Sequence, residues 1–198
     1  MATKDDIKKA AASLFAIKGF EATTMNDIAD AVGLKKQSLY SHIRSKSELY
    51  LTIINERTDL MWEEIVKHNE RIKGVTEEEY IKGFFKSVIE VFTDRENLLL
   101  WRRTIIIYFS DESATDFKQA DWKLRKKVKD ELYRELSGRY ERFANKGYFN
   151  EFFLTFLVLV HGYLSWMMIS HHNNHTLECA WQNYWAGANK YFEDTQRA

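Results

Sequence analysis

Proline is absent from the 198-residue sequence, and only eight glycines are present. Proline interrupts helix interiors and marks turns, so a chain without it is compatible with long helices and short connections. The spacing of apolar residues is helical in almost every stretch and predicts about nine helices. We therefore expect an all-α fold.

Cysteine is nearly absent too, since Cys179 is the only one. A single cysteine excludes an intramolecular disulfide and any zinc site built from several cysteines, and it fits a cytoplasmic protein. The net charge is zero at pH 7, so overall charge does not indicate a nucleic-acid partner. The sequence has no G-x-S-x-G, phosphate-loop or H-E-x-x-H motif. We expect no enzyme activity, no cofactor and no metal.

Charge is missing from one long segment, because no Asp, Glu, Lys or Arg occurs in residues 152–169. Its length approaches that of a membrane-spanning helix. Polar residues at Thr155, His161 and Ser165 interrupt it, and no basic cluster flanks it. We favour a helix buried on all sides in a soluble protein without a membrane partner, and a membrane span is the alternative.

The apolar periodicity and the glycines divide the chain into consecutive helices. Gly19 and Gly33 are placed to end the first two. The expected helices cover residues 5–18, 24–33, 36–43, 45–72, 77–93, 97–109, 116–145, 151–170 and 177–194.

Two short helices meet at Gly33 and form a helix-turn-helix pattern. Thr24 and Asp27 have the spacing of a capping box at the start of the first. Leu39 and Ile43 are the inward pair of the second. In a helix-turn-helix this second helix enters the major groove of DNA while the first crosses the backbone.

The outward face of the second helix carries hydrogen-bond donors and no carboxylate. Lysine donates to guanine and glutamine pairs with adenine, while Tyr, Ser and His side chains suit phosphate oxygens. A solvated helix surface is the alternative, but such a surface usually includes Glu or Asp. The candidate DNA contacts on this face are Lys35, Lys36, Gln37, Ser38, Tyr40, Ser41 and His42.

The run from Leu14 to Tyr50 resembles the DNA-binding domain of the tetracycline-repressor (TetR) family. The matching residues are Leu14-Phe15, Gly19-Phe20, Thr24, Asp27-Ile28-Ala29, Val32-Gly33, Leu39-Tyr40, His42, Ser45-Lys46 and Leu49. The resemblance implies a three-helix DNA-binding domain over residues 1–46 and a helical domain for ligand binding and dimerisation over residues 47–198.

The resemblance also assigns roles to individual residues. It maps phosphate contacts onto Thr24, Tyr40, His42 and Lys46, and base reading onto Lys35, Lys36 and Gln37. The family often has a small hydroxyl residue in place of Lys35 and a glycine near Gln37. Because this chain departs from the family there, no operator sequence can be carried over from a relative.

The last helix has a wide apolar stripe that predicts a partner. With the preceding apolar helix it would form a four-helix bundle across a two-fold axis of a homodimer. The resemblance implies the same dimer, and packing within one chain is the alternative. The candidate interface residues are Leu177, Trp181, Tyr184, Trp185 and Ala188.

The resemblance further implies a ligand cavity in the C-terminal part. Aromatic residues at helical spacing are more often core than ligand contacts, so the sequence does not decide which ones line it. The candidates are Trp62, Phe85, Phe92, Trp101, Tyr108, Phe156, His161 and Trp166.

These observations predict a repressor whose dimer binds a palindromic duplex operator and is released by a small hydrophobic or aromatic ligand. One alternative is a helix-turn-helix regulator controlled by a protein partner, with no small-molecule ligand. Another is an enzyme or carrier that merely retains a helix-turn-helix. The second alternative needs a catalytic pair, for which the sequence offers no candidate.

Overall fold

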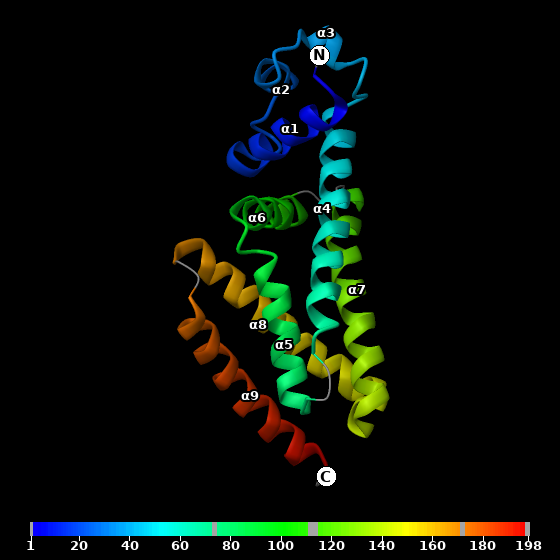
Figure 1. The fold of residues 1–198 in the computed structure, drawn as a ribbon, viewed down its shortest axis with the longest axis vertical. Helices are drawn as coiled ribbons and strands as arrows, with labels where there is room; N and C mark the ends of the chain where they lie inside the picture. The colour runs from blue at the N-terminus through cyan, green and yellow to red at the C-terminus, as the bar shows by residue number, and fades with distance from the viewer. Residues whose placement is uncertain (1, 73–74, 111–114, 171–172, 197–198) are drawn as a thin grey trace. The chain divides into compact units, whose positions relative to one another are not determined.

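This computed structural model describes the backbone of residues 2–72, 75–110, 115–170 and 173–196, and the side chains of these residues except 106–110, 115–121 and 191–196. All regular structure in the described part is helical, which confirms the all-α fold (Figure 1). The elements are α1 (Lys4–Lys18), α2 (Met25–Ala31), α3 (Lys36–Leu39), α4 (Lys46–Asn69), α5 (Glu77–Glu90), α6 (Arg95–Ser110), α7 (Thr115–Arg139), the 3-10 helix η1 (Glu141–Ala144), α8 (Lys146–Ile169) and α9 (Asn174–Gln196).

The helices form two compact units. Unit 1 consists of Met1–Glu63 and Asp94–Lys126, and unit 2 of Glu64–Thr93 and Lys127–Ala198. The long helices α4 and α7 each contribute residues to both units. The two units are defined by the packing of the helices. The boundary expected after residue 46 separates the DNA-binding part from the ligand-binding and dimerisation part, and it stays a prediction.

Unit 1 has an aliphatic core with a few aromatic rings. Phe15 of α1 is fully buried and meets Tyr50 of α4 edge to face, with ring centroids 5.0 Å apart. Leu100 brings α6 into the same core, and α6 packs along α1. The helix-turn-helix elements are therefore supported by α4 and α6.

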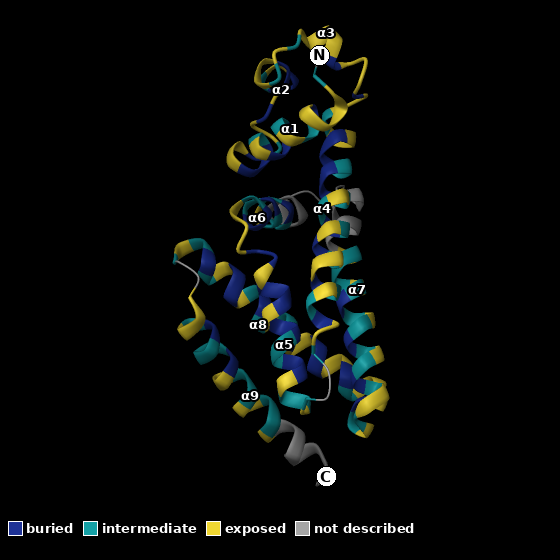
Figure 2. Cartoon of the chain, in the orientation of Figure 1, coloured by how far each residue is buried: buried dark blue, intermediate teal, exposed yellow. Residues whose placement is uncertain are grey.

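Unit 2 has a core made largely of aromatic side chains. Figure 2 shows buried stretches on α5 and α8, which contribute many of them. Phe85 of α5 meets Phe156 of α8 edge to face at 6.3 Å and stacks on Trp181 of α9 at 6.0 Å. Edge-to-face and offset pairs of this kind stabilise a core beyond the area they bury. Both α5 and α9 pack against α8.

The largest differences from the expected helix boundaries concern α3, α7 and α8. Helix α3 ends at Leu39 because the Ser41 hydroxyl donates to the Ser38 carbonyl at 2.6 Å, a local bond that competes with helical pairing. The expected helix 116–145 ends at Arg139 and is followed by η1. Helix α8 begins earlier than expected, where Asn145 caps its first turn by accepting from two backbone amides.

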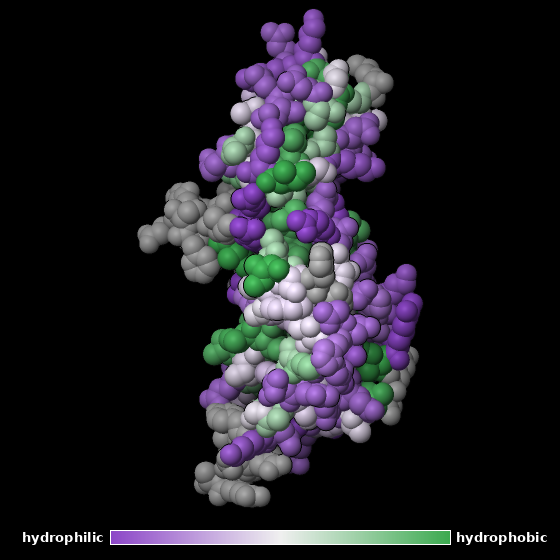
Figure 3. All heavy atoms as spheres, turned by 90° about the vertical axis from the view of Figure 1, so that its left-hand side faces the viewer, coloured by the Kyte–Doolittle hydropathy of each residue, from purple (hydrophilic) through white to green (hydrophobic). Residues whose placement is uncertain are grey.

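Helix α8 is long and apolar enough to cross a membrane by length and composition alone, although a third of its most apolar window (33%) is buried inside the protein. It is not buried on all sides, because Leu154 and Val158 are 63% and 66% exposed. This corrects the expectation of a helix covered all round. Figure 3 views the side on which α9 lies, where apolar residues reach the surface in several places.

Candidate nucleic-acid interface

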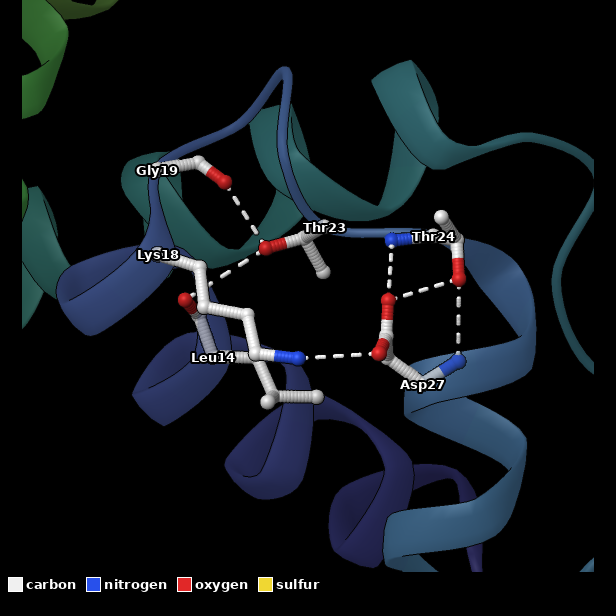
Figure 4. Close-up of polar contacts among 6 residues, drawn as sticks. All are labelled: Leu14, Lys18, Gly19, Thr23, Thr24 and Asp27. Carbon is white, nitrogen blue, oxygen red and sulfur yellow. Dashed lines mark hydrogen bonds and ion pairs between the residues drawn. The ribbon is translucent and has the colours of Figure 1, made fainter.

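The start of α2 is fixed by the pair Thr24 and Asp27. The Thr24 hydroxyl accepts from the Asp27 amide at 3.1 Å, and the Asp27 carboxylate accepts from the Thr24 amide at 2.8 Å. This is the capping box expected from the sequence. Lys18 of α1 forms an ion pair with the same carboxylate at 2.8 Å (Figure 4). The ammonium of Lys18 and the donors of Thr24 hold the pKa of Asp27 well below its usual range.

Hydrogen bonds within the loop and from α4 fix the loop between α1 and α2. Thr23 is completely buried (0% exposed), and its hydroxyl donates to the Gly19 carbonyl at 2.7 Å (Figure 4). Gly19 has a φ of +88°, which residues with a Cβ rarely adopt. From α4, the ammonium of Lys46 donates to the Phe20 carbonyl at 2.8 Å and lies over the Phe20 ring. The loop therefore has a defined conformation relative to both helices.

The turn between α2 and α3 depends on Gly33, whose φ is +66°. The Leu34 amide donates back to the Ala29 carbonyl at 2.9 Å and closes α2. Lys35 is extended and provides no side-chain cap, as its long side chain leads one to expect. The helix-turn-helix predicted from the sequence is thus formed by α2, the glycine turn and α3.

The predicted base-reading residues lie together on an exposed surface. Leu39 and Ile43 are buried (0% and 5% exposed) and face the core of unit 1, as expected. No Asp or Glu occurs in residues 31–47, so this surface offers donors and positive charge to a polyanion. The exposed candidates are Lys35, Lys36, Gln37, Ser38, Tyr40, Ser41 and His42.

The two remaining candidates, Thr24 and Lys46, already have partners within the chain. The hydroxyl and the amide of Thr24 both donate to Asp27, the hydroxyl at 2.6 Å. Lys46 is half-buried, and its ammonium donates to the Phe20 carbonyl at 2.8 Å and to the Glu21 carbonyl at 3.5 Å. A phosphate contact by Thr24 requires a change of partner, whereas Lys46 keeps one of its three ammonium hydrogens for a phosphate. Both roles stay predictions. The spacing of Thr24 and Asp27 predicts the capping box, but no sequence pattern predicts the hydrogen bond between Lys46 and Phe20.

The candidate ligand residues are divided between the two units. Trp62 on α4 and Trp101 and Tyr108 on α6 belong to unit 1. The other candidates belong to unit 2. Phe85 and Phe156 are completely buried and Phe92 is 3% exposed. The half-buried candidates are Trp62, Trp101, His161 and Trp166. The side chain of Tyr108 lies outside the described residues. The list stays a prediction.

Two of the candidate interface residues are buried inside their own protomer. Leu177 is 4% exposed and Trp181 is 0% exposed. The Trp181 indole stacks on Phe85 and donates to Glu78 at 3.3 Å. These two side chains leave no surface for a partner, which corrects the expectation for them. The apolar stripe of α9 is wide enough to pack into the core of unit 2 and also to leave an apolar surface outside it. Periodicity alone does not show which residues of the stripe belong to the core and which to that surface.

The other three candidates, Tyr184, Trp185 and Ala188, are half-buried. Tyr184 and Ala188 line a groove of about 470 Å³ between α8 and α9. A second groove of about 710 Å³ between the same helices also includes Tyr184. Burial raises the pKa of Tyr184 to about 12, so its hydroxyl is protonated and neutral at physiological pH.

The sequence predicts that the apolar helix 151–170 joins the dimer bundle, but none of the candidate interface residues is one of the α8 residues that line these grooves. The larger groove is lined on α8 by Thr155, Val158, Leu159, Gly162, Tyr163 and Trp166, and on α9 by Thr176, Cys179, Ala180, Asn183 and Tyr184. The signal was present in the apolar character of 152–169. That composition predicts a helix with more than one face to bury, but it does not show which residues face α9 and which line a groove.

Comparison with known proteins assigns the N-terminal part to a family. The family "Bacterial regulatory proteins, tetR family" matches residues 7–53. The HTH-type transcriptional repressor KstR2 of Mycolicibacterium smegmatis is 26% identical over 133 residues, which cover 67% of this chain and 63% of the relative. The biofilm operon icaADBC negative regulator IcaR of Staphylococcus aureus (strain Newman) is 49% identical over 47 residues, 24% of this chain and 25% of the relative. The chain thus matches less than two-thirds of either relative.

The solved structure of the TetR family transcriptional regulator PfmR from Thermus thermophilus resembles the whole chain. It has a TM-score of 0.59 and 25% identity, and the match covers 93% of this chain and 94% of PfmR. Fold and site together define a helix-turn-helix DNA-binding protein with an all-helical remainder. Residues 7–53 belong to the tetR family of bacterial regulatory proteins, and the fold of the chain resembles that of the TetR family regulator PfmR.

Proposed function

We propose that this protein is a cytoplasmic transcriptional repressor that binds a palindromic duplex operator as a symmetric homodimer. The observation that carries the proposal is the exposed, acid-free donor surface of α3, presented by a helix-turn-helix. Base edges in the major groove are distinguishable by such donors. Repression is the activity named for KstR2, and for IcaR as negative regulation, and we extend it to this chain.

The dimer we propose uses the α8 and α9 grooves. Leu154 and Val158 expose apolar surface beside them, at 63% and 66%. Small residues such as Gly162 and Ala180 line the larger groove and allow two helices to approach closely. Two such helices from each protomer form a four-helix bundle about a two-fold axis. A two-fold dimer presents two copies of α3, which explains why the operator would be palindromic.

For the effector we propose a small hydrophobic or aromatic molecule. Unit 2 is rich in aromatic side chains, on which flat rings stack favourably. The effector must bind the DNA-free conformation more tightly than the DNA-bound one, because equal affinities shift no equilibrium.

The test begins with selection of duplexes from random DNA by the purified protein. We expect symmetric sites, with half-site centres separated by roughly 34–36 Å, one helical turn. Hydrophobic dyes, drugs and fatty acids are then titrated while tryptophan fluorescence and release of the selected duplex are followed in parallel. Selected sites without two-fold symmetry contradict the proposed dimer. Symmetric sites with no compound that releases the protein favour control by a protein partner.

A further inference from the structure

Helix α6 reaches the end of α1 through Arg103. Its Nη2 donates to the Ile17 carbonyl at 2.7 Å, in the last turn of α1. The guanidinium also rests against the next loop, since a Cβ built on Gly19 lies 3.5 Å from the Arg103 Cζ. A cation at this place satisfies a terminal carbonyl and interacts favourably with the helix dipole. All of these residues belong to unit 1.

The loop that Arg103 contacts also determines where α2 begins. The Gly19 carbonyl accepts the Thr23 hydroxyl at 2.7 Å, and the next residue, Thr24, is the N-cap of α2. We call residues 19–24, which connect α1 to α2, the joint between these helices. Figure 4 shows how closely Gly19, Thr23 and Thr24 follow one another in it. Since α2 is joined to α3 by a short glycine turn, a shift at Gly19 is passed on to the DNA-reading helix.

A second contact holds the same part of α6 to α4. The hydroxyl of Tyr50, which is completely buried, lies 3.1 Å from the hydroxyl of Thr104. Thr104 follows Arg103 directly in the sequence, so two adjacent residues of α6 fix this helix to α4 and to the end of α1. Hydrogen bonds between buried groups have strict geometry and define one arrangement of the elements that they join.

We propose that Arg103 is a positioning residue for DNA recognition. It fixes the joint between α1 and α2, and through it the orientation of α3, without itself binding DNA. The inference rests on the proposed function.

The test compares Arg103→Ala with Arg102→Ala, using a duplex selected by the wild-type protein. Arg102 is its exposed neighbour on α6, so both variants lose the same charge from the same helix. We expect Arg103→Ala to weaken binding about tenfold at a temperature where all variants are fully folded. The slope of log affinity against log salt should stay at its wild-type value, because no phosphate contact is lost. Arg102→Ala should bind like the wild type.

Two further measurements separate positioning from general stability. Hydrogen exchange of the Thr23 and Thr24 amides should accelerate in Arg103→Ala, while exchange in α8 stays unchanged. Arg103→Lys, which keeps a charge and a donor, should recover part of the affinity, and it serves as the test variant if the alanine variant does not fold. Wild-type affinity in Arg103→Ala overturns the proposal, and so does a shallower salt slope. If the wild-type protein selects no duplex, the proposed function fails, and the exchange comparison still tests the joint.

Discussion

Different interactions stabilise the two regions: mainly hydrogen bonds and ion pairs fix the helix-turn-helix, and mainly aromatic packing fills unit 2. Around α1 to α3 the chain is fixed by polar contacts at defined points, such as Thr23 to Gly19 and Lys46 to Phe20. Unit 2 is filled by aromatic rings, of which Phe85 and Phe156 are completely buried. Its polar contacts include the ion pair of Arg142 with Glu77, in which both side chains are half-buried.

The difference reflects what each region must do. A surface that fits the major groove requires a backbone set to a fraction of an ångström, and directional hydrogen bonds provide that accuracy. An aromatic core tolerates many arrangements of similar volume, so its residues can change as long as the space stays filled. We therefore expect unit 1 to respond to changes of single polar atoms and unit 2 to changes of volume.

The largest expected effect is the loss of volume in unit 2. Trp181→Ala removes a fully buried ring that stacks on Phe85 and Trp185, and it should lower the free energy of unfolding by about 3–5 kcal/mol. Trp122→Ala is the matched control, because Trp122 is 61% exposed and should change stability by less than about 0.5 kcal/mol. Urea unfolding followed by circular dichroism measures both. Equal losses in the two variants would show that the core of unit 2 is not organised around Trp181.

A charge placed on the surface of unit 2 should separate the protomers. Val158→Asp puts a carboxylate into the proposed interface, where its burial should cost the dimer about 2–4 kcal/mol. Leu60→Asp is the control, since Leu60 is 55% exposed on α4 of unit 1. Sedimentation equilibrium should show a monomer for the first variant and a dimer for the second. A dimeric Val158→Asp protein would place the interface elsewhere.

Single polar changes on α3, at Tyr40 and at the start of α4 should alter recognition without altering the fold. Lys36→Ala and Gln37→Ala should each cost about 1–3 kcal/mol on the best site and relax the preference at particular bases. Tyr40→Phe should weaken all duplexes similarly, because phosphates carry no sequence identity. Lys46→Ala should do the same and should also loosen the Phe20 loop. Binding to selected and random duplexes measures these effects, and a uniform loss in all four variants would remove the distinction between base and phosphate contacts.

The smallest expected effect is the response of the α2 cap to acid. The pKa of Asp27 is lower in the folded protein than its ordinary value, mainly because of Lys18 and then Thr24. Its contribution to stability is therefore complete above the ordinary carboxyl pKa and is lost as the pH falls below it. Asp27→Asn should flatten the fall of the unfolding midpoint between about pH 5 and pH 2. Asp30→Asn, on the exposed side of the same helix, should leave the acid profile as steep as in the wild type.

Much of unit 1 could be predicted because its signals are local. The capping box of Thr24 and Asp27 and the glycine at position 33 appear in the structure where the sequence placed them. The early end of α3 was not predictable from apolar periodicity, since it depends on the hydrogen bond from the Ser41 hydroxyl to the Ser38 carbonyl. The contact of Lys46 with Phe20 joins residues far apart in the sequence, for which the residue pattern carries no signal.

In unit 2 the sequence predicted helices but not the faces that they bury. The apolar stripe of α9 contains both Trp181, which faces inward, and Tyr184, which lines a groove. Both are aromatic and lie within one turn of each other, so composition does not distinguish them. Their packing is decided by α5 and α8, which lie elsewhere in the chain.

The central claim is that two copies of α3 read one palindromic duplex. Native mass spectrometry of the protein with a selected palindrome, and with the same duplex after one half-site has been scrambled, tests it most directly. We expect two chains on the intact palindrome and a large loss of affinity when one half-site is scrambled. One chain per duplex, bound equally well to both DNAs, would contradict it.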